Sequence, residues 1–168
     1  MATITLKGRP IHTVGALPRS GRPAPPFRLV NGELAEVGLD AFPGQKKILN
    51  IVPSLDTGVC AASARKFNDE VGKLGGTVLL NISADLPFAQ QRFCEAHALK
   101  HIVTLSTFRS PAFGRDYGVA IADGPLAGLM SRAVLVLNAA DTVVYSEQVP
   151  EIAQEPDYAA ALAALKKA

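Results

Sequence analysis

The chain has 168 residues, of which 48% are apolar and 19% are charged, and its net charge is +2. This length is typical of one globular domain with a full hydrophobic core, and the composition excludes a disordered protein. The small positive charge argues against nucleic acid as a partner, because phosphate binding needs a concentrated basic surface. We expect one domain over residues 1–168, with an N-terminal hairpin at 1–17 and a core at 18–168.

The chain contains only two cysteines, Cys60 and Cys94, and no tryptophan. Two cysteines exclude a disulfide-rich secreted scaffold and a four-cysteine zinc or iron–sulfur site, and they permit one intrachain disulfide or none. The N-terminus lacks the apolar core of a signal peptide, and the longest apolar runs are too short to span a bilayer. We therefore expect a cytoplasmic protein with no membrane partner, in a compartment where a lasting disulfide is usually catalytic or redox-sensing.

Residues 1–45 predict short strands and connectors. Apolar residues alternate on both sides of the turn at Gly8–Pro10, which predicts a β-hairpin. The prolines of residues 18–26 exclude a helix or a central strand, because proline lacks the amide N–H and fixes φ. Asn31–Gly32 predicts a turn between two further short strands.

After residue 45 the chain alternates between strands and helices. Continuous apolar runs predict strands at 46–52, 76–83, 101–107, 129–138 and 142–149. Apolar residues at helical spacing, with capping and stop residues at the ends, predict helices at 56–74, 85–98, 110–117 and 157–167. This order predicts a thioredoxin-like α/β fold, in which a mixed central sheet is flanked by helices on both faces and is preceded by the β-hairpin extension.

Cys60 lies where a predicted buried strand gives way to a predicted helix. With Thr57 as the N-cap, Cys60 is the third residue of this helix, and the Thr57 hydroxyl can reach the same space. Unpaired backbone N–H groups and the helix dipole at this position favour the thiolate, which is the nucleophilic form of cysteine. The alternative is a small, buried and inert cysteine. The arrangement of strand, proline, threonine, cysteine and helix favours the reactive sulfur.

Pro53, Thr57 and Cys60 form the pattern P-x-x-x-T-x-x-C, which resembles the signature of the peroxiredoxins. With the segments PSLDTGVC, ISADLPFAQ, RFC, LSTFR and YGVAIADGPL, the chain is similar to the thiol peroxidase family, the atypical two-cysteine peroxiredoxins. The resemblance covers nearly the whole chain. It implies a thioredoxin fold, reduction of hydrogen peroxide and organic (alkyl or lipid) hydroperoxides, and recycling by thioredoxin. The implied role is antioxidant defence and redox homeostasis.

The resemblance also implies site residues. Cys60 matches the peroxidatic cysteine and Cys94 the resolving cysteine, which implies a catalytic disulfide between them. Pro53 and Thr57 match the residues that line the peroxide pocket, and Arg132 matches the family arginine at the start of a late strand. Thr57 and Arg132 are thus expected in both substrate binding and catalysis. The family further suggests a homodimer, and we expect neither a metal nor a cofactor.

Cys94 is expected in the middle of the helix at 85–98. A disulfide requires the two Cα atoms to lie within about 7 Å, so we expect the turns around both cysteines to unwind when the bridge forms. A permanent structural disulfide is the alternative. A domain of this size does not need one, and a reducing compartment opposes it.

Three other functions use the same residues. Cys94, His97 and His101 have the spacing of one helix face and could bind zinc with Cys60 as a fourth ligand, although His101 is expected at the start of the next strand. A thiol–disulfide oxidoreductase would keep the fold, but Thr57 stands where such enzymes carry the first cysteine of C-x-x-C. A non-enzymatic redox sensor is the third possibility.

Overall fold

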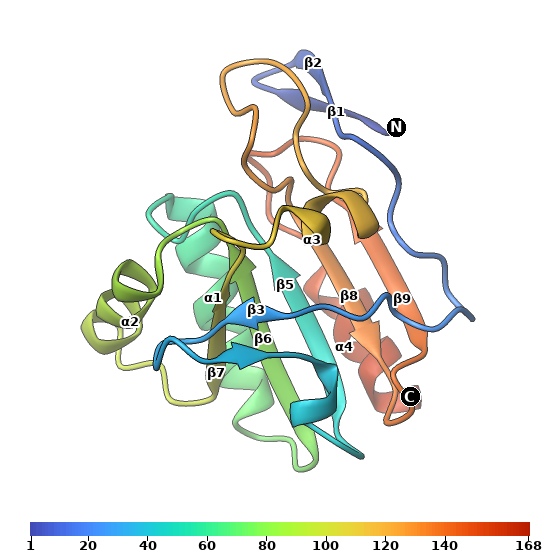
Figure 1. The fold of residues 1–168 in the computed structure, drawn as a ribbon. Helices are drawn as coiled ribbons and strands as arrows, with labels where there is room; N and C mark the ends of the chain where they lie inside the picture. Colours follow the sequence, from blue (N-terminus) through green and yellow to red (C-terminus); the bar gives the residue numbers. More distant parts are fainter.

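The computed structural model describes all 168 residues, Met1–Ala168. The strands are β1 (Thr3–Leu6), β2 (Arg9–His12), β3 (Leu29–Val30), β4 (Glu36–Val37), β5 (Lys46–Ile51), β6 (Thr77–Ser83), β7 (Ile102–Ser106), β8 (Ala133–Leu137) and β9 (Val143–Gln148). The helices are α1 (Gly58–Val71), α2 (Pro87–Ala96), α3 (Pro111–Asp116) and α4 (Tyr158–Lys167), with a short 3-10 helix η1 (Leu39–Ala41). Figure 1 shows the central sheet, with the β1–β2 hairpin standing beyond one end of it.

A mixed sheet of seven strands forms the centre of the fold, in the order β4-β3-β7-β6-β5-β8-β9. β5, β6 and β7 run parallel, whereas β8 pairs antiparallel with both β5 and β9. β1 and β2 form a separate two-stranded hairpin, as the sequence predicts. The prediction of a thioredoxin-like α/β fold with an N-terminal hairpin is confirmed.

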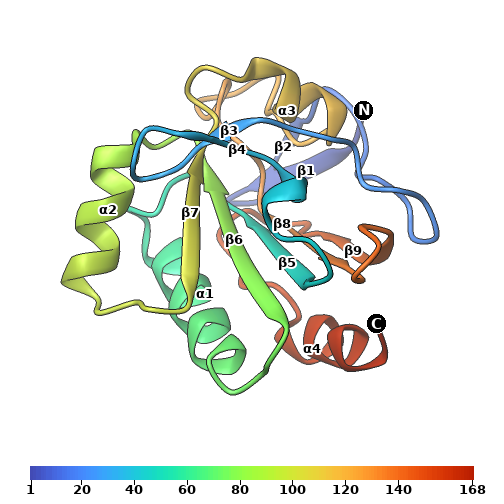
Figure 2. The same cartoon turned by 60° about the horizontal axis from the view of Figure 1, so that its bottom comes forward.

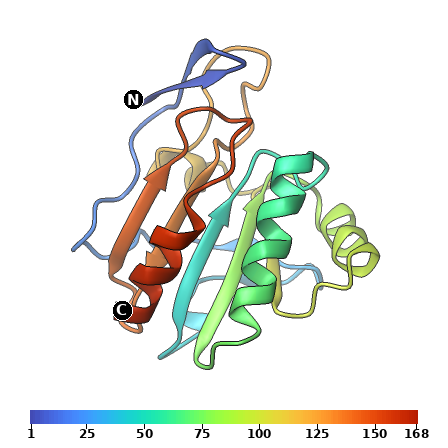
Figure 3. The same cartoon turned by 180° about the vertical axis from the view of Figure 1, so that it is seen from behind.

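Successive side chains of β5 point to opposite faces of the sheet, and each face has its own core. Ile48 packs with Phe67 of α1 and Leu165 of α4, whereas Leu49 packs with Phe113 of α3 on the other face. Figure 3 shows α1 and α4 side by side on the first face, and Figure 2 shows α3 on the opposite side together with β3 and β4. α2 lies beside the β7 side of the sheet (Figure 1). The helices therefore cover both faces, as predicted.

The first helix ends earlier than the sequence predicts. α1 stops at Val71 and not at residue 74. A side chain on the next residue, Gly72, would meet the ring of His101, because an ideal Cβ there would lie 2.7 Å from that ring. The glycine thus allows the end of α1 to pack closely against the segment that leads into β7.

The second helix also ends early, at Ala96 instead of Ala98. The chain takes the left-handed conformation at Ala98, with φ of 51°. The Leu99 N–H donates to the Cys94 carbonyl at 3.0 Å, and the Ala98 N–H donates to the Glu95 carbonyl at 3.2 Å. These two bonds form a Schellman motif, which usually has glycine at its left-handed position. The sequence carries no such signal here, so the stop was missed.

The hairpin is attached to the segment that follows β9. Thr5 accepts a hydrogen bond from the Ile152 N–H at 2.9 Å and donates its own N–H to the Pro150 carbonyl at 2.7 Å. The Glu151 carboxylate accepts from the Gly8 N–H at 3.0 Å and from the Thr5 hydroxyl at 2.7 Å. These hydrogen bonds, that of Gly8 foremost, lower the pKa of Glu151 to about 2. No helix of the structure has both the length and the apolar character needed to cross a membrane.

Candidate active site around Cys60

Cys60 is the third residue of α1, with Thr57 at the N-cap, as the sequence predicts. The parallel strand β5 delivers the chain to this end of the sheet, and the segment 52–57 turns it into the helix. The Cys60 side chain is fully buried and packs with Val52, Leu55 and Ala64. Its backbone N–H makes no hydrogen bond within the protein, which leaves a donor beside the sulfur at the positive end of the helix.

Arg132 brings a positive charge to this sulfur. Its Nη1 donates to Cys60 Sγ at 3.3 Å, and its Nε donates to the Ile152 carbonyl at 2.9 Å. The side chain is only 2% exposed and forms no salt bridge to a carboxylate. A buried guanidinium without a carboxylate partner is stabilised by a nearby electron-rich group, and Cys60 Sγ is the side-chain atom to which Arg132 donates.

Arg132 occupies the residue immediately before β8, which begins at Ala133 and not at residue 129 as predicted. Arg132 is buried and is therefore not a surface arginine at the end of a strand. The interaction with Ile152 was missed, because a backbone acceptor twenty residues away leaves no signal in the sequence.

Thr57 and Pro53 lie in the segment that precedes α1. Thr57 holds the N-cap position, but its hydroxyl donates to the Ser54 carbonyl at 3.2 Å and makes no capping hydrogen bond to the helix. The Thr57 oxygen can still accept a hydrogen bond, and the residue is exposed, so it is open to a small molecule that enters from solvent. Pro53 is buried at the start of this segment, where it supplies no N–H. The structure thus brings Arg132 directly to Cys60 and places Thr57 and Pro53 on the chain that leads to it.

Cys94 lies on a different element, within α2, and both cysteines are free thiols. It is partly buried, and this burial, with a smaller contribution from the Glu95 carboxylate, raises the pKa of the Cys94 thiol to about 11. The adjacent Phe93 packs against the cluster that contains Cys60. α2 therefore contacts the Cys60 site through Phe93, while Cys94 is held in a regular helix as a protonated thiol.

A carboxylate that the sequence did not single out connects these two regions. Asp85 follows β6 and accepts hydrogen bonds from the Ser54 hydroxyl at 2.7 Å and from the Leu55 N–H at 2.8 Å. The only signal in the sequence was its place between a strand end and a proline that starts a helix, where an aspartate is usually a cap or turn residue.

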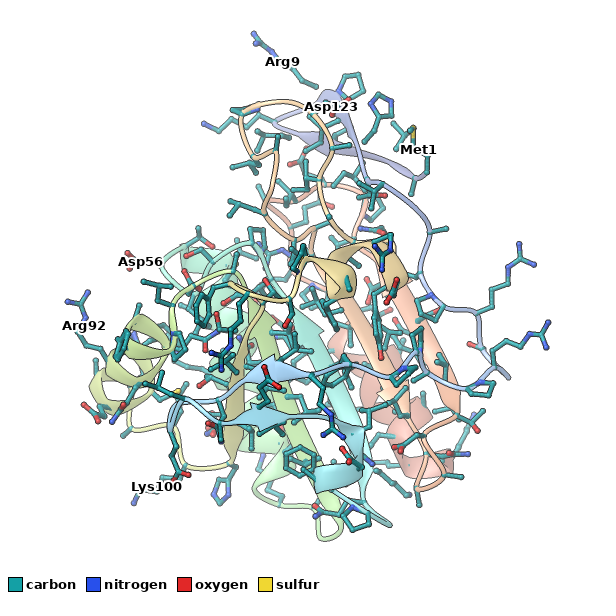
Figure 4. All side chains as sticks on the ribbon, viewed as in Figure 1. Met1, Arg9, Asp56, Arg92, Lys100 and Asp123 are labelled. Carbon is teal, nitrogen blue, oxygen red and sulfur yellow. The ribbon has the colours of Figure 1, made fainter.

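A cavity of about 270 Å³ opens between the segment before α1 and the exposed side of α2. It is lined by Ser54, Leu55, Asp56, Asp85, Ala89, Arg92, Phe93, Ala96 and His97. Figure 4 shows Asp56 and Arg92 projecting outward on this same side of the molecule. A larger cavity of about 860 Å³ lies beside α3 and η1, and none of the predicted site residues lines either cavity. The smaller cavity is thus the one that adjoins both cysteine-bearing segments.

The residues of the possible zinc site do not share one helix. α2 ends at Ala96, His97 is its C-cap, and His101 lies beyond the left-handed turn, where its backbone N–H donates to Asn68 Oδ1. No group of three or more histidine, cysteine or carboxylate side chains in the structure is arranged to hold a metal ion.

The chain is similar to known thiol-dependent enzymes. The Redoxin family model matches residues 19–162. The thiol peroxidase of Mycobacterium tuberculosis is 54% identical over 165 residues, which cover 98% of this chain and 99% of the relative.

Two solved structures share the fold over nearly the full length. A peroxiredoxin-like protein from Aquifex aeolicus is 35% identical, with a TM-score of 0.93 over 99% of this chain and 97% of that protein. A thiol peroxidase from Chromobacterium violaceum is 27% identical, with a TM-score of 0.91 over 98% of this chain and 95% of that protein.

Proposed function

The chain belongs to the Redoxin family as a peroxiredoxin of the thiol peroxidase type, and we propose that its thiol-dependent peroxidase chemistry occurs at Cys60. The contact of 3.3 Å between Arg132 Nη1 and the buried Cys60 Sγ is the observation that carries this proposal. The proposed substrates are hydrogen peroxide and organic (alkyl or lipid) hydroperoxides. The proposed role is antioxidant defence and redox homeostasis in the cytoplasm.

In the first step, the Cys60 thiolate attacks one oxygen of the peroxide in line with the O–O bond. The S–O bond forms as the O–O bond breaks. The departing oxygen takes up from solvent the proton that the Cys60 thiol released when it ionised, and it leaves as water or an alcohol. Sulfur is oxidised to a sulfenic acid, and the peroxide is reduced. Negative charge moves from sulfur to oxygen, so donors fixed beside those atoms stabilise the transition state more than the ground state.

Arg132 and the Cys60 N–H are the proposed donors to the peroxide oxygens. The Thr57 oxygen is proposed to accept a hydrogen bond from the O–H of the bound hydroperoxide, and rotation of its hydroxyl away from Ser54 would let it donate as well. Pro53 is proposed to line the pocket with apolar surface that has no competing N–H. All of these groups are provided by the protein, so the step uses neither a metal nor a cofactor.

In the second step, the Cys94 sulfur attacks the Cys60 sulfenic acid. The new S–S bond forms while the hydroxyl of the sulfenic acid leaves as water, carrying the proton that Cys94 loses. Cys60 is buried and Cys94 is held within α2, so the turns around both residues are proposed to unwind. Reduced thioredoxin is the proposed reductant, which exchanges its dithiol for this disulfide and returns both cysteines to thiols.

Steady-state peroxide consumption with thioredoxin and its reductase tests this function. The substitution Cys60→Ser should abolish turnover, because it removes the attacking sulfur. The substitution Cys94→Ser should leave sulfenic acid formation intact and block recycling. Full activity of the Cys60→Ser protein would overturn the proposal. Thioredoxin-dependent reduction of a disulfide substrate by this protein, without any peroxide, would instead favour a general thiol–disulfide oxidoreductase. Oxidation of Cys60 by peroxide once, without turnover, would favour a sensor.

The proposed unwinding has its own test in amide hydrogen exchange. Residues 57–64 and 90–97 should lose protection when the reduced protein is converted to the disulfide form. Equal protection of both segments in the two forms would show that the disulfide is made without unwinding.

We also propose that the protein is a homodimer, with neither nucleic acid nor membrane as a partner. Three large apolar side chains are exposed at the start of α2 and in the loop after β7: Leu86, Phe88 and Phe108. These two regions are adjacent, because Ser106 Oγ donates a hydrogen bond to the Asp85 carbonyl. Light scattering coupled to size exclusion should give the mass of two chains at micromolar concentration. Charged substitution at Phe88 should lower that mass, whereas a monomeric wild-type protein would contradict the proposal.

A further inference from the structure

Asp85 is an acceptor for several hydrogen bonds that the peroxidase chemistry described above does not use. Its Oδ1 accepts from the Ser54 hydroxyl at 2.7 Å. Its Oδ2 accepts from the Leu55 N–H at 2.8 Å and from the Ser83 hydroxyl at 2.7 Å. Asp85 forms no salt bridge, so its carboxylate is held by neutral donors alone.

Two of these donors belong to the segment that leads to Cys60. The Leu55 side chain is 3% exposed and packs against Cys60, so fixing the Leu55 N–H also fixes an apolar cover over the sulfur. Ser54 accepts from the Thr57 hydroxyl through its carbonyl and from the Asp56 N–H through its Oγ. The position of Thr57 thus depends on Ser54, which Asp85 holds.

The other side of the network reaches the helix that carries Cys94. The buried Gln90 side chain of α2 donates through Nε2 to Ser83 Oγ at 3.0 Å and to the Leu105 carbonyl at 3.0 Å. Ser83 in turn donates to Asp85, which stands two residues before the start of α2. One carboxylate therefore joins the segment before Cys60 to the first turns of the Cys94 helix.

We propose that Asp85 is a positioning residue that latches the Cys60 segment to α2, and that this latch opens when the Cys60–Cys94 disulfide forms. The inference rests on the proposed function, because it needs both oxidation steps. While closed, the latch holds Leu55 and Thr57 in place for the reaction with peroxide. The same hydrogen bonds oppose the unwinding that disulfide formation requires. Loss of the latch should therefore slow the first step and speed the second.

The substitutions Asp85→Ala and Asp85→Asn separate geometry from charge. Alanine removes both side-chain acceptors. Asparagine can keep the arrangement, since its Oδ1 can accept from Leu55 and Ser83 while its Nδ2 donates to Ser54 Oγ. Asp116→Ala, which removes an exposed carboxylate of α3 whose ion-pair partner is Arg115, is the matched control. Ser54→Ala removes a single bond to the latch and serves if Asp85→Ala does not fold.

Each step is measured by mixing the reduced protein rapidly with hydrogen peroxide, quenching in acid, and determining the mass of the intact protein by mass spectrometry. Sulfenic acid formation is followed in the Cys94→Ser background, and disulfide formation with both cysteines present. Asp85→Ala should slow the first step by about tenfold, the effect of losing one or two hydrogen bonds, and should speed the second step several-fold. Ser54→Ala should change both rates in the same directions but less. Asp85→Asn and Asp116→Ala should stay within about twofold of the parent.

Equal slowing of both steps in Asp85→Ala, or no change in either, overturns the latch while leaving the peroxidase function intact. Asparagine behaving like alanine also overturns it, because a latch built of hydrogen bonds is restored by that residue. Failure of the parent protein to form any sulfenic acid contradicts the proposed function itself, so the two failures are distinct.

Discussion

The Ile152 carbonyl accepts the Arg132 Nε–H at 2.9 Å, and this bond fixes the plane of the guanidinium that contacts Cys60. Arginine can serve both partners because its donors point in fixed directions from one rigid plane. Lysine has a single nitrogen on a flexible stem and cannot hold both partners in this geometry.

The substitution Arg132→Lys should therefore retain positive charge and lose rate. We expect the second-order rate of Cys60 oxidation by hydrogen peroxide to fall by about 10- to 100-fold, the value of one charged hydrogen bond. Competition for peroxide against a peroxidase of known rate provides the measurement. Arg115→Lys, at a mostly exposed arginine of α3, is the control and should change nothing. An unchanged rate in Arg132→Lys would show that charge alone is sufficient.

Burial raises the pKa of the Cys94 thiol to about 11 in the folded protein, from 9.0 when it is free. Alkylation of Cys94 in the Cys60→Ser protein should therefore be slow near neutral pH and should increase up to about pH 11. In urea the same thiol should titrate near 9.0. An alkylation midpoint near 9 in the folded protein would contradict the burial of this thiol.

The same shift has a consequence for stability. A raised pKa means that the fold favours the protonated thiol, so this contribution is complete below about pH 9 and is lost as the pH rises towards 11. The free energy of unfolding of the Cys60→Ser protein should decline over this range more steeply than that of a protein that also carries Cys94→Ser. Parallel declines in urea titrations of the two proteins would contradict the prediction.

Ala98 holds the left-handed position of the Schellman motif at the end of α2. A residue with a Cβ costs about 1–2 kcal/mol in this conformation, whereas glycine adopts it freely. Ala98→Gly should therefore stabilise the end of α2 by about 1 kcal/mol in urea unfolding, and it should slow disulfide formation because the helix that carries Cys94 becomes harder to unwind.

Ala96→Gly supplies the control for this substitution, because it places glycine at the last residue of the helix, where it should destabilise by up to about 1 kcal/mol. Faster disulfide formation in Ala98→Gly would show that unwinding of this end does not limit the second step.

Glu151 has its pKa lowered to about 2 by its hydrogen bonds to the hairpin, first among them that of Gly8. A lowered pKa means that the fold favours the carboxylate, so the stabilisation is present above about pH 4.5 and is lost as the pH falls through 2. Glu151→Gln should lower the melting temperature at neutral pH, and this difference from wild type should shrink as the pH falls from 4.5 to 2. A constant difference across that range would contradict the assignment.

The sequence was sufficient to predict the elements whose signals are local. Thr57 precedes a regular apolar helix, so the start of α1 and the place of Cys60 in its first turn could be predicted directly, whereas the end of α1 was placed three residues too late. The end of α2 and the start of β8 could not be predicted in this way. The first depends on a strained alanine at position 98, and the second depends on how Arg132 is buried between distant segments.

The site shows the same division. Cys60 and Thr57 lie within one turn of each other and could be paired from spacing alone. The contact of Arg132 with Cys60 came from family resemblance, because 72 residues separate them. The hydrogen bonds of Asp85 to Ser54 and Leu55 cross between the ends of two parallel strands. These contacts depend on the order of the strands in the sheet, which no local sequence pattern predicts.

The N-terminal hairpin is joined to the same short segment that holds Arg132. Glu151 binds the hairpin turn through its side chain, and the next residue, Ile152, holds the arginine through its carbonyl while its side chain packs against Ile4 of β1. We therefore expect an affinity tag fused to Met1, or a shortened N-terminus, to change the position of Arg132, which contacts the Cys60 sulfur. Rates for this enzyme are best measured on protein tagged after α4, whose end lies away from the hairpin (Figure 1).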